Sequence, residues 1–334
     1  MTVELKRKLV DKQSGVLYEL AVDGKLYRLP FVRATDFIAG ATRTNAVIVR
    51  SGGYLRLKRG ELTTVVLPGV PQSTEQVSMG IFGEGVRVIK VLEKERVRQS
   101  ATSKGNQLKW LKGGEFIKAD TLGYEAFAEV WASRVAHRTS IGKFAPITDY
   151  SPCGIVSDGA RFTGCVCRDF LSPGETLLPL ERLIQQASGA PSADWWGAVD
   201  TRKKIERTVA LVTRVTGIKN FGEWLTCLLE FDALILNEDR HMYNIAVVAS
   251  QGRYRLMPLF DNGAAFLSDT TIDHQLRIPT KVCKRKVKAM PFNRSFTAQV
   301  NAARDLYSAQ LVCEKGTQAL VNRLIESRGG RYAD

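Results

Sequence analysis

No stretch of this sequence approaches the roughly 18 consecutive apolar residues that a membrane-spanning helix needs. Residues 1–10 are charged and lack an apolar core segment, so they do not predict a secretory signal peptide. The chain has three histidines and six cysteines, of which Cys165 and Cys167 alone lie close together. A C-x-C spacing with so few histidines does not predict a zinc site, and without a secretory signal the cysteines are expected to be reduced thiols. We therefore expect a cytoplasmic protein without a membrane span.

The remaining composition is that of an ordinary globular protein with an excess of positive charge. Of the 334 residues, 44% are hydrophobic and 25% are charged, and this length suffices for two or three domains. Lys and Arg outnumber Asp and Glu by 48 to 34, which gives a formal net charge of +14. Such a charge favours phosphate-bearing partners such as nucleotides or tRNA, or an acidic protein, but it does not determine the fold.

Two β-hairpins and a further strand are predicted within residues 1–95. The first hairpin pairs residues 16–22 with residues 25–29 across Asp23-Gly24, a dipeptide typical of type I′ turns. The second hairpin and the added strand are predicted at residues 46–50, 54–58 and 62–67. We therefore predict a small, mostly β amino-terminal domain over residues 1–95, whose role the sequence does not reveal.

A second β-rich region is predicted over residues 96–170. Its first hairpin joins residues 107–111 to residues 115–119, and the returning strand carries Lys118 back beneath the loop at residues 103–106. An ammonium group at that place would neutralise nucleotide phosphates. The alternative is an exposed strand lysine with no function.

A helix predicted over residues 123–138 follows this hairpin. Glu125 and Glu129 lie one turn apart on one edge of it. In kinases a glutamate on the corresponding helix pairs with the strand lysine and directs it toward phosphate. Glu125 is nearer the hairpin end of the helix and is the first choice to pair with Lys118, while Glu129 stays an alternative.

The rest of this region and the region after it are predicted from short local patterns. Strands are expected at residues 144–147, 153–156 and 161–170, and helices at residues 175–186, 202–216, 221–236, 296–308 and 317–326. The strand at residues 161–170 connects the β-rich region to the helical region that follows. The backbone around Cys165 and Cys167 on this strand is therefore a candidate for hydrogen bonding adenine. Residues 281–288 carry five basic residues and are expected to form a solvated loop or to contact an acidic or phosphorylated partner.

Three oxygen-bearing side chains surround one predicted hairpin near the end of the 221–236 helix. Asp239 follows the helix, Asn244 precedes the strand at residues 245–249, and Asp261 follows the returning strand at residues 254–259. Asp239 and Asn244 have the separation found in the catalytic loop of protein kinases, where a later Asp also holds metal. Carboxylate and amide oxygens are groups that hold Mg²⁺ against nucleotide phosphates. Taken singly, each residue is common in turns; together and in this order, they favour phosphoryl transfer.

With these segments in order, the chain resembles the HipA-like serine/threonine kinases, a bacterial family distantly related in fold to the phosphoinositide kinases. The resemblance covers about residues 98–315, in the segments SKGNQLKW, GGEFIKADTLGYEAFAEV, TGCVCRDFL, NEDRHMYNIAVV, LMPLFDNG and KAMPFNRSFTAQVNAARDLY. It does not extend to residues 1–95. What it implies about residue roles is that Asp239 is the catalytic base, Asn244 and Asp261 ligate Mg²⁺, and Lys118 contacts the ATP phosphates.

The same resemblance implies roles for four further residues. Gly105 and Asn106 would belong to the phosphate loop, and Ser103 stands where the family carries a serine that can be autophosphorylated. His241, by its likeness to phosphoinositide kinases, would stabilise the charge that develops during transfer. The expected cofactors are ATP and Mg²⁺, and the expected substrate is a protein hydroxyl, for which translation-related proteins are the family precedent. A small antitoxin-type partner is also expected, with nucleic acid involved only indirectly.

The predicted fold class is α+β. We predict a bilobal, protein-kinase-like fold in which residues 96–170 form a small β-rich lobe and residues 171–334 form a larger helical lobe, preceded by the β domain at residues 1–95. The predicted function is that of an ATP- and Mg²⁺-dependent serine/threonine protein kinase. The alternatives are a small-molecule or lipid kinase that uses the same site, and a non-catalytic module that binds RNA or protein.

Overall fold

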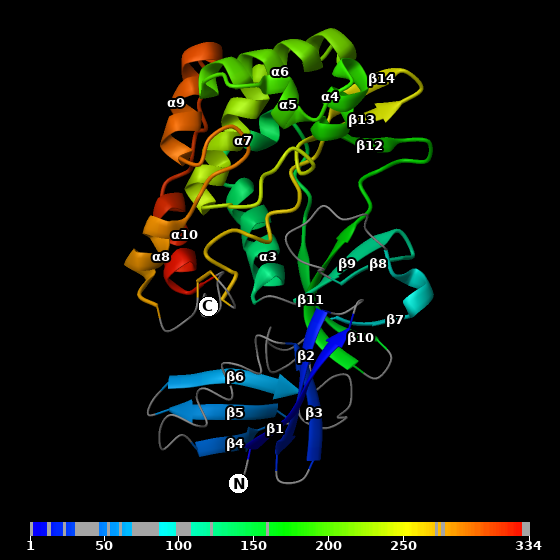
Figure 1. The fold of residues 1–334 in the computed structure, drawn as a ribbon, viewed down its shortest axis with the longest axis vertical. Helices are drawn as coiled ribbons and strands as arrows, with labels where there is room; N and C mark the ends of the chain where they lie inside the picture. The colour runs from blue at the N-terminus through cyan, green and yellow to red at the C-terminus, as the bar shows by residue number, and fades with distance from the viewer. Residues whose placement is uncertain are drawn as a thin grey trace. The chain divides into compact units, whose positions relative to one another are not determined.

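The computed structural model places two compact units, each of which is described by itself (Figure 1). The residues that it describes are 3–11, 15–22, 25–30, 47–51, 54–59, 62–68, 87–97, 108–120, 123–157, 160–270, 273–274 and 278–328. Unit 1 comprises Met1–Ala126, Ser151–Val166 and Asp269–Gln275, and unit 2 comprises Phe127–Tyr150, Cys167–Ser268 and Leu276–Asp334. The mixed α+β class predicted from the sequence is confirmed by the helices and sheets described below.

Six strands at the beginning of the chain form two three-stranded antiparallel sheets. The first sheet has the order β1-β2-β3 and the second has the order β4-β5-β6. Their bounds are β1 Val3–Asp11, β2 Gly15–Val22, β3 Lys25–Pro30, β4 Val47–Ser51, β5 Tyr54–Arg59 and β6 Leu62–Pro68. The two predicted hairpins and the added strand are therefore present, whereas β1 was not expected. That residues 1–95 form a separate domain stays a prediction.

A five-stranded sheet with the order β7-β10-β11-β9-β8 follows in the chain. The bounds are β7 Val88–Val91, β8 Lys109–Lys112, β9 Glu115–Ala119, β10 Ser151–Ser157 and β11 Ala160–Arg168. A short 3₁₀ helix, η1 (Glu93–Glu95), lies between β7 and β8. The core of this five-stranded sheet consists of the buried side chains Ile89, Val91, Leu108, Trp110, Ile117, Ala119, Cys153, Ile155 and Val166. The hairpin β8-β9, which carries Lys118, is thereby held within a packed sheet, as the sequence predicts.

Asp120 links β9 to the first turn of the helix α3 (Glu125–Ala136). Its carboxylate accepts the backbone N–H of Ala126 at 2.7 Å and the hydroxyl of Thr163 at 2.5 Å. An aspartate at a helix start satisfies an otherwise unpaired N–H group and complements the helix dipole. The end of the Lys118 strand and the start of α3 are therefore fixed to each other.

Unit 2 is mainly helical and contains a third three-stranded sheet, β12-β13-β14 (Figure 1). The helices are η2 Ser140–Lys143, α4 Leu180–Ser188, α5 Ser192–Trp196, α6 Thr201–Thr216, α7 Phe221–Ile235, α8 Thr280–Lys286, α9 Phe296–Tyr307 and α10 Thr317–Glu326. The strands are β12 Thr176–Pro179, β13 Ala246–Ser250 and β14 Arg253–Leu256. Within the described part of the chain, no helix has the length and apolar character required to cross a membrane.

Helix α7 forms the centre of unit 2. Nearly all of its side chains are buried, and it packs against α6 and α9. Its close approach to α9 depends on Gly222, where a Cβ atom would overlap the ring of Tyr307. The leucine spacing that predicts a buried helix before Asp239 is thus confirmed, and the helix ends at Ile235.

Three local predictions for this unit are wrong. Residues 176–179 were expected to be helical but form β12, because their backbone pairs with β13 and the helix begins only after Pro179. Residues 144–147 were expected to form a strand, but η2 precedes them and only Ile147 makes an isolated bridge, to Leu259. Residues 281–288 were expected to form a loop, but most of them lie in α8, which buries Cys283.

Candidate active site

The loop that carries Asp239 is fixed to the end of α7 by hydrogen bonds. Leu236 adopts a left-handed conformation with φ of 56° and ends the helix. The Asn237 side chain then donates to Asp232 Oδ1 at 3.0 Å and accepts the backbone N–H of Asp239 at 3.2 Å. Asp239 therefore begins a loop whose first residues have little freedom.

Asp239 and Asn244 are joined through the main chain. The carbonyl oxygen of Asp239 accepts the N–H of His241 at 2.9 Å and the side-chain Nδ2 of Asn244 at 2.7 Å. The backbone N–H of Asn244 donates to the His241 carbonyl at 2.8 Å, which closes the turn. Because the amide nitrogen of Asn244 is used by this loop, its amide oxygen is the atom suited to hold a cation.

Asp261 follows the hairpin β13-β14, whose turn at Gln251-Gly252 has positive φ at both residues, as a type I′ turn requires. Asp261 itself has φ of 58°, in the left-handed region that aspartate tolerates better than most residues. Its neighbour Asn262 is buried, and the Asn262 N–H donates to Glu129 Oε2 at 2.8 Å. A side chain of α3 thus supports the loop that presents Asp261.

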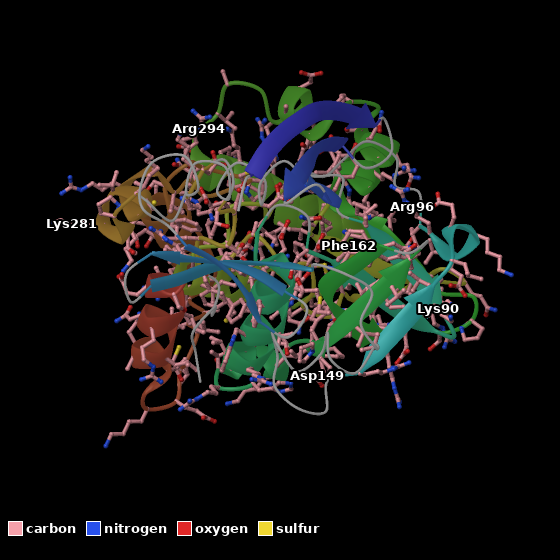
Figure 2. The ribbon with its side chains drawn as sticks, turned by 90° about the horizontal axis from the view of Figure 1, so that it is seen from below. Lys90, Arg96, Asp149, Phe162, Lys281 and Arg294 are labelled. Atoms are coloured by element: carbon pink, nitrogen blue, oxygen red, sulfur yellow. The ribbon has the colours of Figure 1, made fainter. Side chains whose placement is uncertain are left out.

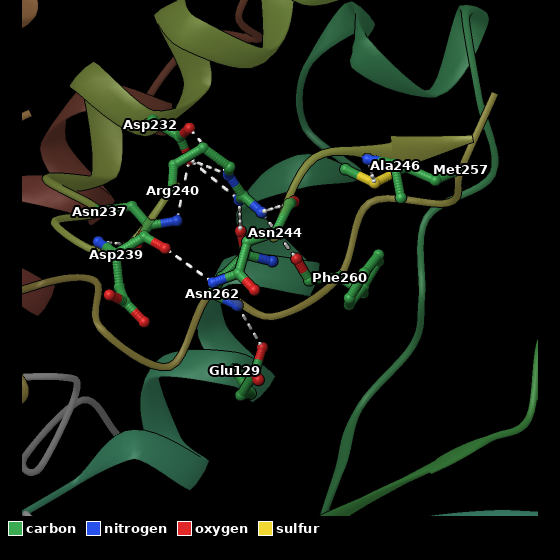
Figure 3. Close-up of polar contacts among 10 residues, drawn as sticks. All are labelled: Glu129, Asp232, Asn237, Asp239, Arg240, Asn244, Ala246, Met257, Phe260 and Asn262. Atoms are coloured by element: carbon green, nitrogen blue, oxygen red, sulfur yellow. Dashed lines mark hydrogen bonds and ion pairs between the residues drawn. The ribbon is translucent and has the colours of Figure 1, made fainter. Parts of the chain in front are cut away.

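Arg240 connects these two loops and is fully buried (Figure 3). Its Nε lies 2.9 Å from Asp232 Oδ2, and both side chains are essentially inaccessible. Its Nη1 donates to the backbone carbonyls of Asn244 and Phe260 at 3.2 and 3.0 Å, and its Nη2 donates to Asn262 Oδ1 at 2.5 Å. One guanidinium therefore binds the carbonyl of Asn244, a predicted metal ligand. It also binds Phe260 and Asn262, the two residues that flank Asp261, the other predicted ligand.

The charges of this buried pair follow from its hydrogen bonds. Burial by itself would lower the pKa of Arg240, but Asp232, with smaller effects from Asp261 and Glu129, raises that pKa overall. Burial also raises the pKa of Asp232, and the donors of Arg240 and Asn237 oppose that rise. With charge-assisted hydrogen bonds reaching the carboxylate from two side chains, we assign both groups as ionised at neutral pH.

His241 lies beside Asp239 in this loop, with a largely buried side chain. Its Nε2 is 3.8 Å from Asp239 Oδ2, which exceeds hydrogen-bond distance, and its ring stands edge-on to Tyr243 with centroids 6.0 Å apart. The side chains of His241 and Asp239 are 16% and 17% exposed, but both ring nitrogens of His241 and Oδ1 of Asp239 are buried.

The donor set suits a metal that also binds phosphate. Among the described residues, no group of three or more His, Cys, Asp and Glu side chains could hold a metal by itself. Asn244 and Asp261 offer an amide oxygen and a carboxylate on loops that Arg240 fixes. Mg²⁺ commonly takes one or two protein oxygens and completes its shell with phosphates and water, so these residues fit it.

The predicted nucleotide-binding residues lie largely in unit 1. Lys118 is buried on β9, and Glu125 is buried in the first turn of α3. Whether Glu125 or Glu129 pairs with Lys118 stays a prediction. The predicted phosphate-loop residues Ser103, Gly105 and Asn106 lie outside the described residues.

The predicted adenine-binding residues lie on β11. Cys165 and Cys167 are both buried. The last residue pair between β10 and β11 is Ser151 with Val166, so Cys167 lies beyond the reach of β10. Hydrogen bonding of adenine by this backbone stays a prediction.

The sequence reasoning missed the supporting residues of the site. Asp232 is fully buried on a helix whose other charged residues are Glu223 and Glu230, and a charge in such a place requires a partner. Arg240, eight residues later, is that partner. The pair of Asp232 and Arg240 could therefore have been predicted from the sequence. The contact of Glu129 with Asn262 could not, because it joins segments that are far apart in the chain.

Comparison with known proteins gives limited information. No family model matches the chain, and no curated protein matches it. Among solved structures, it is similar to the Helicobacter pylori proinflammatory kinase CtkA, with 17% identity and a TM-score of 0.41 over 56% of this chain and 63% of that one. It is also similar to HipA of Shewanella oneidensis, solved with HipB and operator DNA, with 12% identity and a TM-score of 0.33 over 72% of this chain and 66% of that one. Likenesses at this level carry no argument about the site.

Proposed function

We propose that the protein is an ATP- and Mg²⁺-dependent phosphotransferase that phosphorylates serine or threonine hydroxyls of a protein. The observation that carries the proposal is the buried Arg240, which anchors the loops of Asn244 and Asp261 to the same point of α7. Catalysis of phosphoryl transfer depends mainly on positioning and charge neutralisation. Two loops of hard oxygen ligands held by one guanidinium meet that requirement.

Each residue of the site has a proposed role. Asp239 orients the acceptor hydroxyl and accepts its proton during in-line transfer, and His241 stabilises the charge that develops. Asn244 and Asp261 hold Mg²⁺, which when bound neutralises the phosphates and orients them. Lys118 neutralises phosphate charge.

The remaining proposed roles follow the resemblance. The segment with Ser103, Gly105 and Asn106 covers the phosphates, and the backbone near Cys165 and Cys167 contacts adenine. A small antitoxin-type partner also stays a proposal.

The decisive experiment is phosphate transfer from γ-labelled ATP with Mg²⁺, followed by mass spectrometry of the products. Asp239→Ala is compared with wild type, and Asp194→Ala serves as the control because Asp194 is an exposed aspartate of α5. We expect Asp239→Ala to lower transfer by about 10²- to 10⁴-fold while ATP binding persists. The Asp194→Ala variant should match wild type.

The outcomes separate the candidate functions. The proposal is supported by label on a serine or threonine of this or another protein that appears with wild type and Asp194→Ala and is strongly reduced with Asp239→Ala. Label found in a metabolite or lipid pool and never in protein would favour the small-molecule alternative. No transfer and no ATP binding, together with salt-dependent RNA binding, would favour the binding module.

A further inference from the structure

The segment that follows the candidate active site along the chain is basic throughout. Between Asp273 and Asp305 the sequence contains eight basic residues and no acidic one. Six of these residues are exposed in the described part of the segment and form what we call the basic surface: Lys281, Lys284, Arg285, Lys286, Lys288 and Arg294. Figure 2 shows the side chains of Lys281 and Arg294 reaching outward from the protein.

Buried residues hold the basic surface in place. Cys283 on α8 and Ala289 after it are buried, and Phe292 packs against Trp196 with ring centroids 5.4 Å apart. The Asn293 side chain donates to the Thr201 hydroxyl at 2.7 Å. The charges therefore stand on an ordered segment and need little further ordering to meet a partner.

The basic surface adjoins the loop of the proposed catalytic base. The backbone N–H of Lys288 donates to Glu238 Oε1 at 3.1 Å, and Glu238 directly precedes Asp239. The end of the basic surface at Lys288 is thus tied to the loop that carries Asp239.

Most of this charge makes no ion pair within the part of the chain that the structure describes. Lys284 pairs with Glu326 at 3.1 Å on the surface. Lys281, Arg285 and Lys286 make no ion pair among the described residues. Three exposed cations on one seven-residue helix are therefore available to an anionic partner.

We propose that the basic surface binds an acidic segment of the protein that this enzyme phosphorylates. The inference rests on the proposed function, because it assigns the substrate class of the same site. Nucleic acid fits less well, since single strands are usually bound by aromatic stacking and Phe292, the one aromatic residue within residues 278–295, is buried.

Binding is measured by fluorescence anisotropy without ATP, so that its result does not depend on phosphate transfer. The probes are a labelled peptide with one serine among Asp and Glu residues, a matched peptide with Asn and Gln instead, and a single-stranded RNA oligonucleotide. The surface variant is Lys281→Gln/Arg285→Gln/Lys286→Gln. The control variant is Arg214→Gln/Lys219→Gln/Lys315→Gln, which removes the same charge from exposed positions elsewhere in unit 2.

We expect the acidic peptide to bind wild type and the control variant with the same affinity. It should bind the surface variant about tenfold more weakly, because each of the three lost ion pairs raises the affinity by a small factor. Binding should weaken as salt rises. The inference is overturned if both peptides bind equally, if the control variant loses as much affinity, or if RNA binds more tightly than the acidic peptide. Failure of the labelled-ATP experiment above, with peptide binding intact, would instead overturn the proposed function.

Discussion

Replacement of Arg240 by methionine tests whether the buried ion pair organises the candidate active site. The substitution gives an apolar side chain of comparable length and removes the guanidinium donors to Asp232, to the two carbonyls and to Asn262. The carboxylate of Asp232 is then buried without its charged partner. We expect both stability and transfer to fall.

The magnitude follows from the burial of both groups. Removing one member of a buried ion pair costs about 3–5 kcal/mol of unfolding free energy. For a unit of this size, that corresponds to a decrease of roughly 10 °C in the unfolding midpoint. The double variant Asp232→Asn/Arg240→Met removes the stranded charge as well, so we expect it to recover part of the stability. It should not recover transfer, because the Asn244 and Asp261 loops still lack their common donor.

The assays are thermal unfolding and labelled-ATP transfer on the same preparations. Arg214→Met, at an exposed position of α6, is the matched control and should change the free energy of unfolding by no more than about 0.5 kcal/mol. An unfolding midpoint of Arg240→Met within about 2 °C of wild type would refute the energetic reasoning, because a drop several times larger is expected. Transfer that returns with stability in the double variant would refute the positioning role.

Two further predictions concern packing and pH. In Gly164→Ala, the new Cβ would overlap the carbonyl oxygen of Lys118, so we expect a loss of about 1–3 kcal/mol in thermal unfolding. Gly154→Ala is the milder control, since its Cβ would meet only a valine methyl at 3.3 Å, and equal unfolding midpoints for the two variants would contradict the packing argument. The hydrogen bonds of Arg255 lower the pKa of Glu175 from 4.5 to about 2, so this pair stabilises the fold above pH 4.5 and loses its effect as pH falls toward 2. The difference in midpoint between wild type and Glu175→Gln should therefore shrink over that range, and a difference that grows would show the sign to be wrong.

Local sequence patterns predicted the parts of unit 2 whose causes are local. Residues 317–326 are helical as predicted, and the hairpin around Gln251-Gly252 is present, because periodicity and turn residues determine them. The strand β12 was missed because its partner β13 lies about seventy residues away, and only that pairing makes it a strand.

The order of the site residues was readable, but the structure that supports them was not. Asp239, Asn244 and Asp261 follow one another around a predictable hairpin. The hydrogen bonds of Arg240 to both loops depend on how the loops pack beside α7, and no pattern along the chain encodes that packing. The charge of Asp232 among the apolar residues at the end of α7 was the local clue to it.

The pairing of β12 with β13 has a consequence for how the chain folds. These strands enclose residues 180–245, which contain α4 to α7 and the Asp239 loop. Closing so long a loop costs chain entropy before any strand contact is gained, whereas β13 and β14 close over a two-residue turn. The hairpin can form early, but its third strand adds stability only once the helices have packed. We therefore expect β12, which must wait for four helices to pack, to be among the last parts of unit 2 to reach its native form.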